Sequence, residues 1–152
     1  MNKEYFKQNE DNCYEKLLML QDKLPIDNIG RTPEKYHYDA SGTTTLSGKT
    51  YEFAIELKDR FNYSLESFNK FGSIMIEAHK LSQLLLELII NNRIPFYINF
   101  TSDGYAIIYN VRKLKKYPTL RKFNNIQSKG YERRESGDRF MLDLHDAMII
   151  KL

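Results

Sequence analysis

The sequence predicts an α+β (or α/β) fold in a single domain spanning residues 1–152. Two segments, residues 3–24 and 73–91, repeat apolar residues at helical spacing. Between them, residues 51–58 alternate apolar and polar side chains with the period of a strand. Together with two shorter strand-like segments before residue 51 and two more after residue 91, these give the order helix, three strands, helix, two strands.

Length and composition are those of an ordinary globular protein. The 152 residues are 41% hydrophobic and 28% charged, which suffices for one buried core and excludes a disordered chain. Cys13 is the only cysteine, so an intrachain disulfide and a cysteine-based zinc site are excluded. The most apolar run, residues 84–90, is short and contains Glu87. We therefore expect a cytoplasmic protein with no membrane partner.

The first half of the chain is expected to form one helix and a strand meander. Residues 3–24 place Phe6, Cys13, Leu17, Leu20 and Leu24 on one stripe, and Pro25 ends the helix. Short strands are expected at residues 35–39 and 43–46, around a Ser-Gly turn at residues 41–42. A second Ser-Gly turn at residues 47–48 leads into the strand at 51–58.

The second half is expected to be helix, hairpin and a less regular end. Residues 59–72 are expected to be a loop, and Ser73 to cap a largely buried helix that ends near Asn91 and lies across the sheet. Strands follow at residues 94–100 and 105–111, joined by a turn at Ser102-Asp103-Gly104. A final hairpin is expected from residues 140–144 and 147–152.

One group of charged residues points to chemistry. Residues two apart on a strand share a face, so Glu56 and Lys58 project together. A second carboxylate, Asp39, comes from a neighbouring predicted strand, and two carboxylates beside an ammonium can hold a divalent cation against a phosphate. The structural alternative is an ordinary half-exposed sheet whose charges face water, with Asp39 serving as a turn former.

The chain resembles the PD-(D/E)XK, or restriction-endonuclease-like, nuclease superfamily. The resemblance covers roughly residues 3–111 and rests on the element order together with Asp39, Glu56 and Lys58. Tyr38, rather than proline, precedes Asp39. The resemblance implies a central mixed β-sheet of about five strands flanked by helices, in the order αβββαββ, with the final hairpin as an extension.

The same resemblance implies an Mg²⁺-dependent or Mn²⁺-dependent endonuclease that hydrolyses phosphodiester bonds in DNA. Asp39, Glu56 and the backbone carbonyl of Leu57 would hold the metal, and Lys58 would assist the attacking water. Some members add an acidic residue from the first helix, for which Glu10 is the candidate. Such small nucleases occur in bacteria and in mobile elements such as phages. The alternative is a noncatalytic nucleic-acid-binding or assembly module on the same fold.

Two further groups of residues are candidates for supporting roles. Six positive charges fall within residues 112–122 and could contact phosphates, or could form only a solvated basic loop: Arg112, Lys113, Lys115, Lys116, Arg121 and Lys122. Arg133, Arg134 and Arg139 could extend this patch. On the second helix, Glu77, Lys80 and Gln83 could support the Lys58 side of the site, although Lys80 and Gln83 are expected on the solvated face.

The charge distribution is uneven along the chain. The net charge is +3, but residues 111–152 contain eleven Lys and Arg against five Asp and Glu, a net +6, whereas the preceding residues carry twelve against fifteen, a net −3. A basic C-terminal third is compatible with a nucleic-acid partner and leaves DNA and RNA both open. The apolar excess of the second predicted helix permits a homodimer without requiring one.

Overall fold

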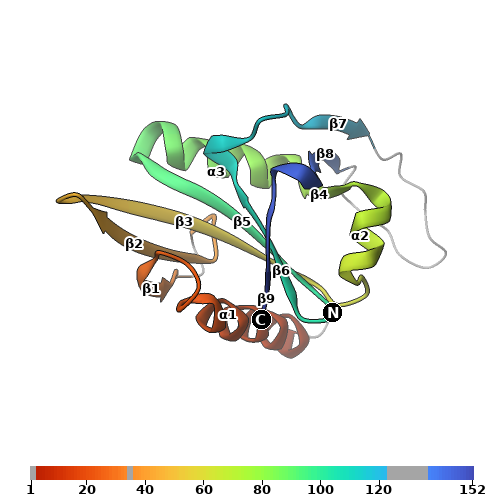
Figure 1. Ribbon diagram of the computed structural model, residues 1–152, viewed down its shortest axis with the longest axis horizontal. Coiled ribbons are helices and arrows are strands. Elements are labelled where there is room, and N and C mark those ends of the chain that lie inside the picture. The colour runs from red at the N-terminus through yellow and green to blue at the C-terminus, as the bar shows by residue number, and fades with distance from the viewer. Residues whose placement is uncertain (1–2, 34–35, 123–136) are drawn as a thin grey trace.

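A computed structural model describes residues 3–33, 36–122 and 137–152, without the side chain of Phe6. Its central sheet has six strands in the order β1-β2-β3-β5-β6-β9, and a second sheet has the order β4-β8-β7 (Figure 1). The central strands are β1 (Asp27–Arg31), β2 (Ala40–Leu46), β3 (Lys49–Arg60), β5 (Arg93–Thr101), β6 (Tyr105–Asn110) and β9 (Met148–Lys151). The second sheet is built from β4 (Ser73–Glu77), β7 (Thr119–Lys122) and β8 (Asp138–Asp143).

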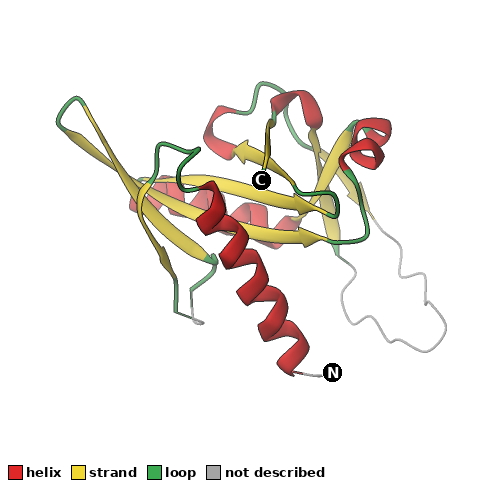
Figure 2. Ribbon diagram, turned by 60° about the horizontal axis from the view of Figure 1, so that its bottom comes forward, coloured by secondary structure: helices red, strands yellow, loops and turns green. Residues whose placement is uncertain are grey.

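Helices lie on both faces of the central sheet. Helix α1 (Lys3–Leu20) covers one face, and α3 (Ala78–Asn91) with the second sheet covers the other (Figures 1 and 2). The alternation of β3 explains this division, because Ile55 and Leu57 pack in the core cluster under α1 whereas Ala54 packs in the cluster under α3. Among the described residues, no helix has the length and apolar character needed to cross a membrane.

The connection from β3 to β5 shapes the region of interest. These strands are parallel neighbours, so the chain must cross over between them, and it does so through α2 (Leu65–Phe71), β4 and α3. Helix α2 lies where a loop was predicted; Ser64 caps its N-terminus, and Gly72, at φ 74°, ends it in a left-handed conformation. Short 3₁₀ helices η1 (Val111–Lys113) and η2 (Leu144–Asp146) complete the fold.

Several predicted boundaries are wrong. The helix predicted over residues 73–91 begins at Ala78, because residues 73–77 pair with β8 as a strand. The predicted C-terminal hairpin does not form: β8 pairs with β4 and β7, whereas β9 pairs with β6 in the central sheet. Helix α1 ends at Leu20, four residues before the predicted end, although Leu24 is still buried.

The meander is also longer than predicted. Strand β1 was not predicted, and the described residues 36–39 form bends rather than a strand. The Ser-Gly pair at residues 41–42 lies inside β2, where a Cβ on Gly42 would come within 2.4 Å of the Ile26 side chain. The turn at residues 47–48 is confirmed, with positive φ at both Ser47 and Gly48. The strands at 94–100 and 105–111 are confirmed to within one residue at each end.

Candidate active site

Asp39 lies directly before β2 and is tied to the middle of the Glu-Leu-Lys segment. The backbone N–H of Asp39 donates to the carbonyl of Ile55 at 2.9 Å. In return, the backbone N–H of Leu57 donates to Asp39 Oδ2 at 2.8 Å. Since Ala40 pairs with Ile55 in the antiparallel register, Asp39 reaches β3 at the level of Glu56.

Glu56 is a buried carboxylate with one oxygen unsatisfied. The residue is only 7% exposed, and its Oε1 lies 2.8 Å from Lys80 Nζ. Its Oε2 is buried and has no hydrogen-bond partner. Burial, and then the nearby charge of Asp39, raise the pKa of Glu56 to about 7, although Lys80 and Lys58 act in the opposite direction. Holding the ionised Glu56 carboxylate in this buried position beside Asp39 therefore costs free energy.

The two lysines of the site differ in environment. Lys80 is partly buried, and although burial lowers its pKa, the carboxylates of Glu56, Asp39 and Glu77 together outweigh this and leave the pKa raised, so the ammonium stays charged. Lys58 is 46% exposed, and its Nζ lies 3.9 Å from Glu77 Oε1. Glu77 also lies 3.4 Å from His79 Nε2. A loosely held ammonium therefore faces solvent next to the buried carboxylate.

These residues fit a divalent cation. A buried carboxylate oxygen without a partner, beside a second carboxylate, is the arrangement that Mg²⁺ or Mn²⁺ satisfies with hard oxygen ligands. Within the described residues, no three His, Cys, Asp or Glu side chains cluster at metal-binding spacing. A cation here would need further oxygens, from a backbone carbonyl, water or substrate.

Comparison with known proteins decides the fold. No protein-family model matches the chain, and no curated protein matches it. Among solved structures, it is similar to Hjc, a Holliday junction resolvase from the archaeal hyperthermophile Archaeoglobus fulgidus, with a TM-score of 0.56 and 12% identity over 93% of this chain and 91% of the resolvase. The chain has the restriction-endonuclease-like fold. The fold expected from the sequence is therefore confirmed, and the similarity extends beyond residue 111.

Other residues of this restriction-endonuclease-like fold lock the second sheet to the site. Arg60 continues the face of Glu56 and Lys58, and its guanidinium donates to Asn99 Oδ1 at 3.0 Å, to the carbonyl of Met75 at 2.6 Å and to the Tyr97 hydroxyl at 2.9 Å. The Tyr97 hydroxyl donates to the same carbonyl at 2.9 Å. This set of contacts, which we call the clamp, was not predicted from the sequence, although residues 56, 58 and 60 share one face of the strand.

The supporting candidates lie in different places. Glu77 and Lys80 each contact a predicted site residue, so the expectation of a solvated Lys80 is wrong. Gln83 instead hydrogen-bonds His37 at 3.1 Å. Glu10 lies on α1 with its side chain 66% exposed, 3.9 Å from Arg31. Helix α1 faces β3 through other residues, since Lys16 lies 3.5 Å from Asp59.

The basic residues of the segment 112–122 are exposed, but two of them, Lys115 and Lys116, contact acidic residues. Arg112 and Lys113 are exposed on η1, and Arg121 and Lys122 on β7. Backbone N–H groups of Lys115 and Lys116 donate to Asp146, and Lys116 Nζ lies 3.0 Å from Asp143. A hydrogen bond from the backbone N–H of His145, followed by a hydrogen bond from the Lys116 ammonium, lowers the pKa of Asp143 to about 2. Arg133 and Arg134 lie outside the described residues.

Proposed function

We propose that this chain is a metal-dependent nuclease that hydrolyses phosphodiester bonds in DNA. The observation that carries the proposal is the buried Glu56 carboxylate, whose unpaired Oε2 lies in a site shared with Asp39. Burying such a group without a partner is unfavourable, and a bound cation removes the cost. The similarity to a Holliday junction resolvase supports an enzyme that acts on DNA.

Each residue of the site has a proposed role. Asp39, Glu56 and the carbonyl of Leu57 would hold Mg²⁺ or Mn²⁺, which when bound polarises a phosphate and lowers the pKa of a bound water. Lys80 neutralises part of the charge on Glu56 and keeps that carboxylate in place at 2.8 Å. Lys58, exposed and only loosely paired, is free to orient the attacking water or to neutralise charge on the phosphate in the transition state.

The residues around the site would position the substrate. Glu77 limits where the Lys58 ammonium can move, and Arg60 fixes the strand that carries Glu77. The exposed cations on η1 and β7 would contact the backbone on either side of the cleaved bond, which adds affinity without base specificity. Glu10 remains a proposed accessory carboxylate that would have to leave Arg31 to take part.

The test is cleavage by the purified protein. Plasmid, single-stranded and branched DNA would each be incubated with Mg²⁺, Mn²⁺ or EDTA, for the wild type and for Glu56→Gln and Lys58→Ala. We expect cleavage that requires the metal and falls at least about a hundredfold in each variant, while the fold and most of the DNA affinity persist. Glu66→Gln, at a 79% exposed side chain on α2, is the matched control and should cleave normally.

Two results would contradict the proposal. Full cleavage by Glu56→Gln would show that the reaction takes place elsewhere or comes from a contaminant. DNA binding by the wild type without cleavage of any substrate would instead support the noncatalytic binding module.

A further inference from the structure

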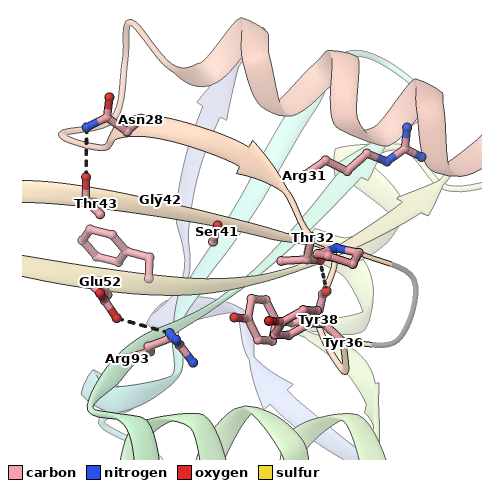
Figure 3. A pocket seen from close by; sticks show the side chains of 12 residues that line it. Asn28, Arg31, Thr32, Tyr36, Tyr38, Ser41, Gly42, Thr43, Glu52 and Arg93 are labelled. Atoms are coloured by element: carbon pink, nitrogen blue, oxygen red, sulfur yellow. Dashed lines mark hydrogen bonds and ion pairs between the residues drawn. The ribbon is translucent and has the colours of Figure 1, made fainter.

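A hollow lies near the candidate site, along the same strands. It has a volume of about 280 Å³ and is lined by residues of β1, β2, β3 and the start of β5, together with Thr32, Pro33, Tyr36 and Tyr38. Figure 3 shows Tyr36 and Tyr38 at one end of this hollow, and Glu52 with Arg93 at the other. Ser41 and Thr43 of β2 also line it.

The sheet register connects the hollow to the candidate site. Thr43 pairs with Glu52, and Ser41 with Ala54, so the next step along the same two strands brings Asp39 to Glu56. Glu52 and Glu56 are four positions apart on β3, a distance of about 13 Å along a strand. A nucleic-acid strand with one phosphate at Asp39 and Glu56 can therefore place a nearby nucleotide over the hollow.

The charges around the hollow do not favour an anion. Arg93 lies 3.3 Å from Glu52 and 2.8 Å from Glu87, so both its neighbours are carboxylates. Arg31 is paired with Asp11 and lies near Glu10, both on α1, and Figure 3 shows its side chain directed toward that helix. The positive charge is already balanced, and a neutral ligand with hydrogen-bonding edges fits better than a phosphate.

The tyrosine end of the hollow is well supported. The Tyr36 ring is 47% exposed and meets the buried Tyr38 ring edge-on, with 5.8 Å between centroids. The carbonyl of Tyr38 accepts a hydrogen bond from the Thr32 hydroxyl, and the N–H of Thr32 donates to the carbonyl of Asp39 at 3.1 Å. A half-exposed tyrosine ring thus packs against a buried tyrosine whose backbone is hydrogen-bonded, and it lines the same hollow as Ser41 and Thr43. Sites that stack a base also present an accessible aromatic ring.

We propose that this hollow binds the base of an unpaired nucleotide, stacked against Tyr36, with Ser41 and Thr43 available to its polar edge. The inference rests on the proposed function for the substrate being a nucleic acid, and it adds that the strand near the cut is unpaired. A base inside a duplex is already stacked on both faces and cannot present one to a tyrosine ring.

The test distinguishes binding through the bases from binding through the sugar-phosphate backbone. Binding to an oligothymidylate of about 15 nucleotides, within the usual site sizes for single strands, is compared with binding to an abasic oligonucleotide of equal length and charge, both in EDTA. We expect Tyr36→Ala to weaken binding of the oligothymidylate about tenfold while leaving the abasic affinity and the salt dependence unchanged. Tyr36→Phe keeps the ring and should bind as the wild type does.

Two further variants sharpen the outcome. Ser41→Leu places a larger side chain at a residue that lines the hollow, and it should weaken binding of the oligothymidylate as Tyr36→Ala does. Tyr5→Ala, at a 52% exposed tyrosine on α1, should not weaken it. The inference is overturned if Tyr36→Ala weakens both ligands equally, if it weakens neither, or if the wild type does not prefer the ligand with bases. None of these results depends on cleavage, so the proposed function can stand or fail separately.

Discussion

The protonation of Glu56 depends strongly on its surroundings. Its pKa rises from the ordinary 4.5 to about 7, chiefly through burial. The folded, metal-free protein therefore binds a proton here that the unfolded chain releases at lower pH. This group contributes stability that is fully present below about pH 4.5 and is lost as pH rises through about 7. A cation would favour the ionised form instead.

If the proposed cation binds at Glu56, this linkage predicts that its binding releases a proton. Because the carboxyl must ionise first, the apparent Mn²⁺ affinity should rise about tenfold per pH unit below pH 7 and level off above it. Calorimetry in two buffers with different ionisation enthalpies should report nearly one proton released per ion at about pH 6 and almost none at about pH 8.

Variants test the assignment to this side chain. Glu56→Gln should abolish the proton release together with most of the affinity, and Glu66→Gln should change neither. Mn²⁺ affinity that is independent of pH across this range would mean that Glu56 is not a ligand.

At the residue scale, the sequence could predict contacts along and between neighbouring strands but not contacts from the helix. Asp39 and Glu56 come together because the turn at residues 47–48 is as predicted, although residues 36–39 are bends rather than a strand and β2 runs through the predicted turn at 41–42. The partner of Glu56, Lys80, could not be predicted. Its direction depends on where α3 begins, and that start is set by strand β4 and its pairing with β8.

At the element scale, the clamp between Arg60 and β4 holds the crossover in place. Three acceptors converge on one guanidinium, and one of them, the carbonyl of Met75, also accepts from Tyr97. Met75 is two residues before Glu77, so the clamp sets the position of the carboxylate that contacts Lys58. Loss of the clamp should loosen the site and the second sheet together.

We predict graded losses of stability from this clamp. Arg60→Gln should lower the free energy of unfolding by about 2–3 kcal/mol, because removal of the charged donor leaves its partly buried acceptors without a hydrogen bond. Tyr97→Phe should cost only about 1 kcal/mol, since Arg60 still donates to the same carbonyl. Urea unfolding measures both, with Arg112→Gln as an exposed arginine control. Equal, negligible changes in both variants would show that β4 is held in some other way.

The segment at residues 73–77 shows why element types were harder to predict than the fold. Ile74 and Ile76 alternate as a strand requires, and both are buried. Ile74 also has the helical spacing to Ala78 and Leu81, so the period of the following helix could be extended back over this segment. The deciding partner, β8, lies far along the chain, and local patterns carry no information about it.

At the scale of the whole molecule, charge is divided between regions. The net +6 of residues 111–152 contrasts with the −3 of the rest of the chain. Figure 1 shows β7 on the side of the central sheet that α3 occupies, away from α1. The candidate site faces that same side, because its partners Glu77 and Lys80 come from β4 and α3. A polyanion approaching this side meets the exposed cations of η1 and β7.

The salt dependence of DNA binding should report this arrangement. If Arg112 and Lys113 each contact a phosphate, their double substitution by alanine should reduce the slope of log affinity against log salt by about 2 for duplex DNA. Fluorescence anisotropy in EDTA measures the slope without cleavage. The double variant Lys3→Ala/Lys7→Ala, on the exposed surface of α1, should leave it unchanged. An unchanged slope in the Arg112→Ala/Lys113→Ala variant would show that these residues of η1 do not contact phosphates.

The pairing of β4 with β8 also imposes an order on biosynthesis. The closest partners in this ladder, Glu77 and Arg139, are 62 residues apart, and β8 is the only strand that pairs with β4 among the described residues. Asp39, Glu56 and Lys58 leave the ribosome well before residue 139 is translated, so a growing chain has its two carboxylates long before the strand bearing Glu77 can be fixed. Assembly of the site therefore waits until β8 has been translated, and a translation product that stops before β8 lacks the ladder that orders the site.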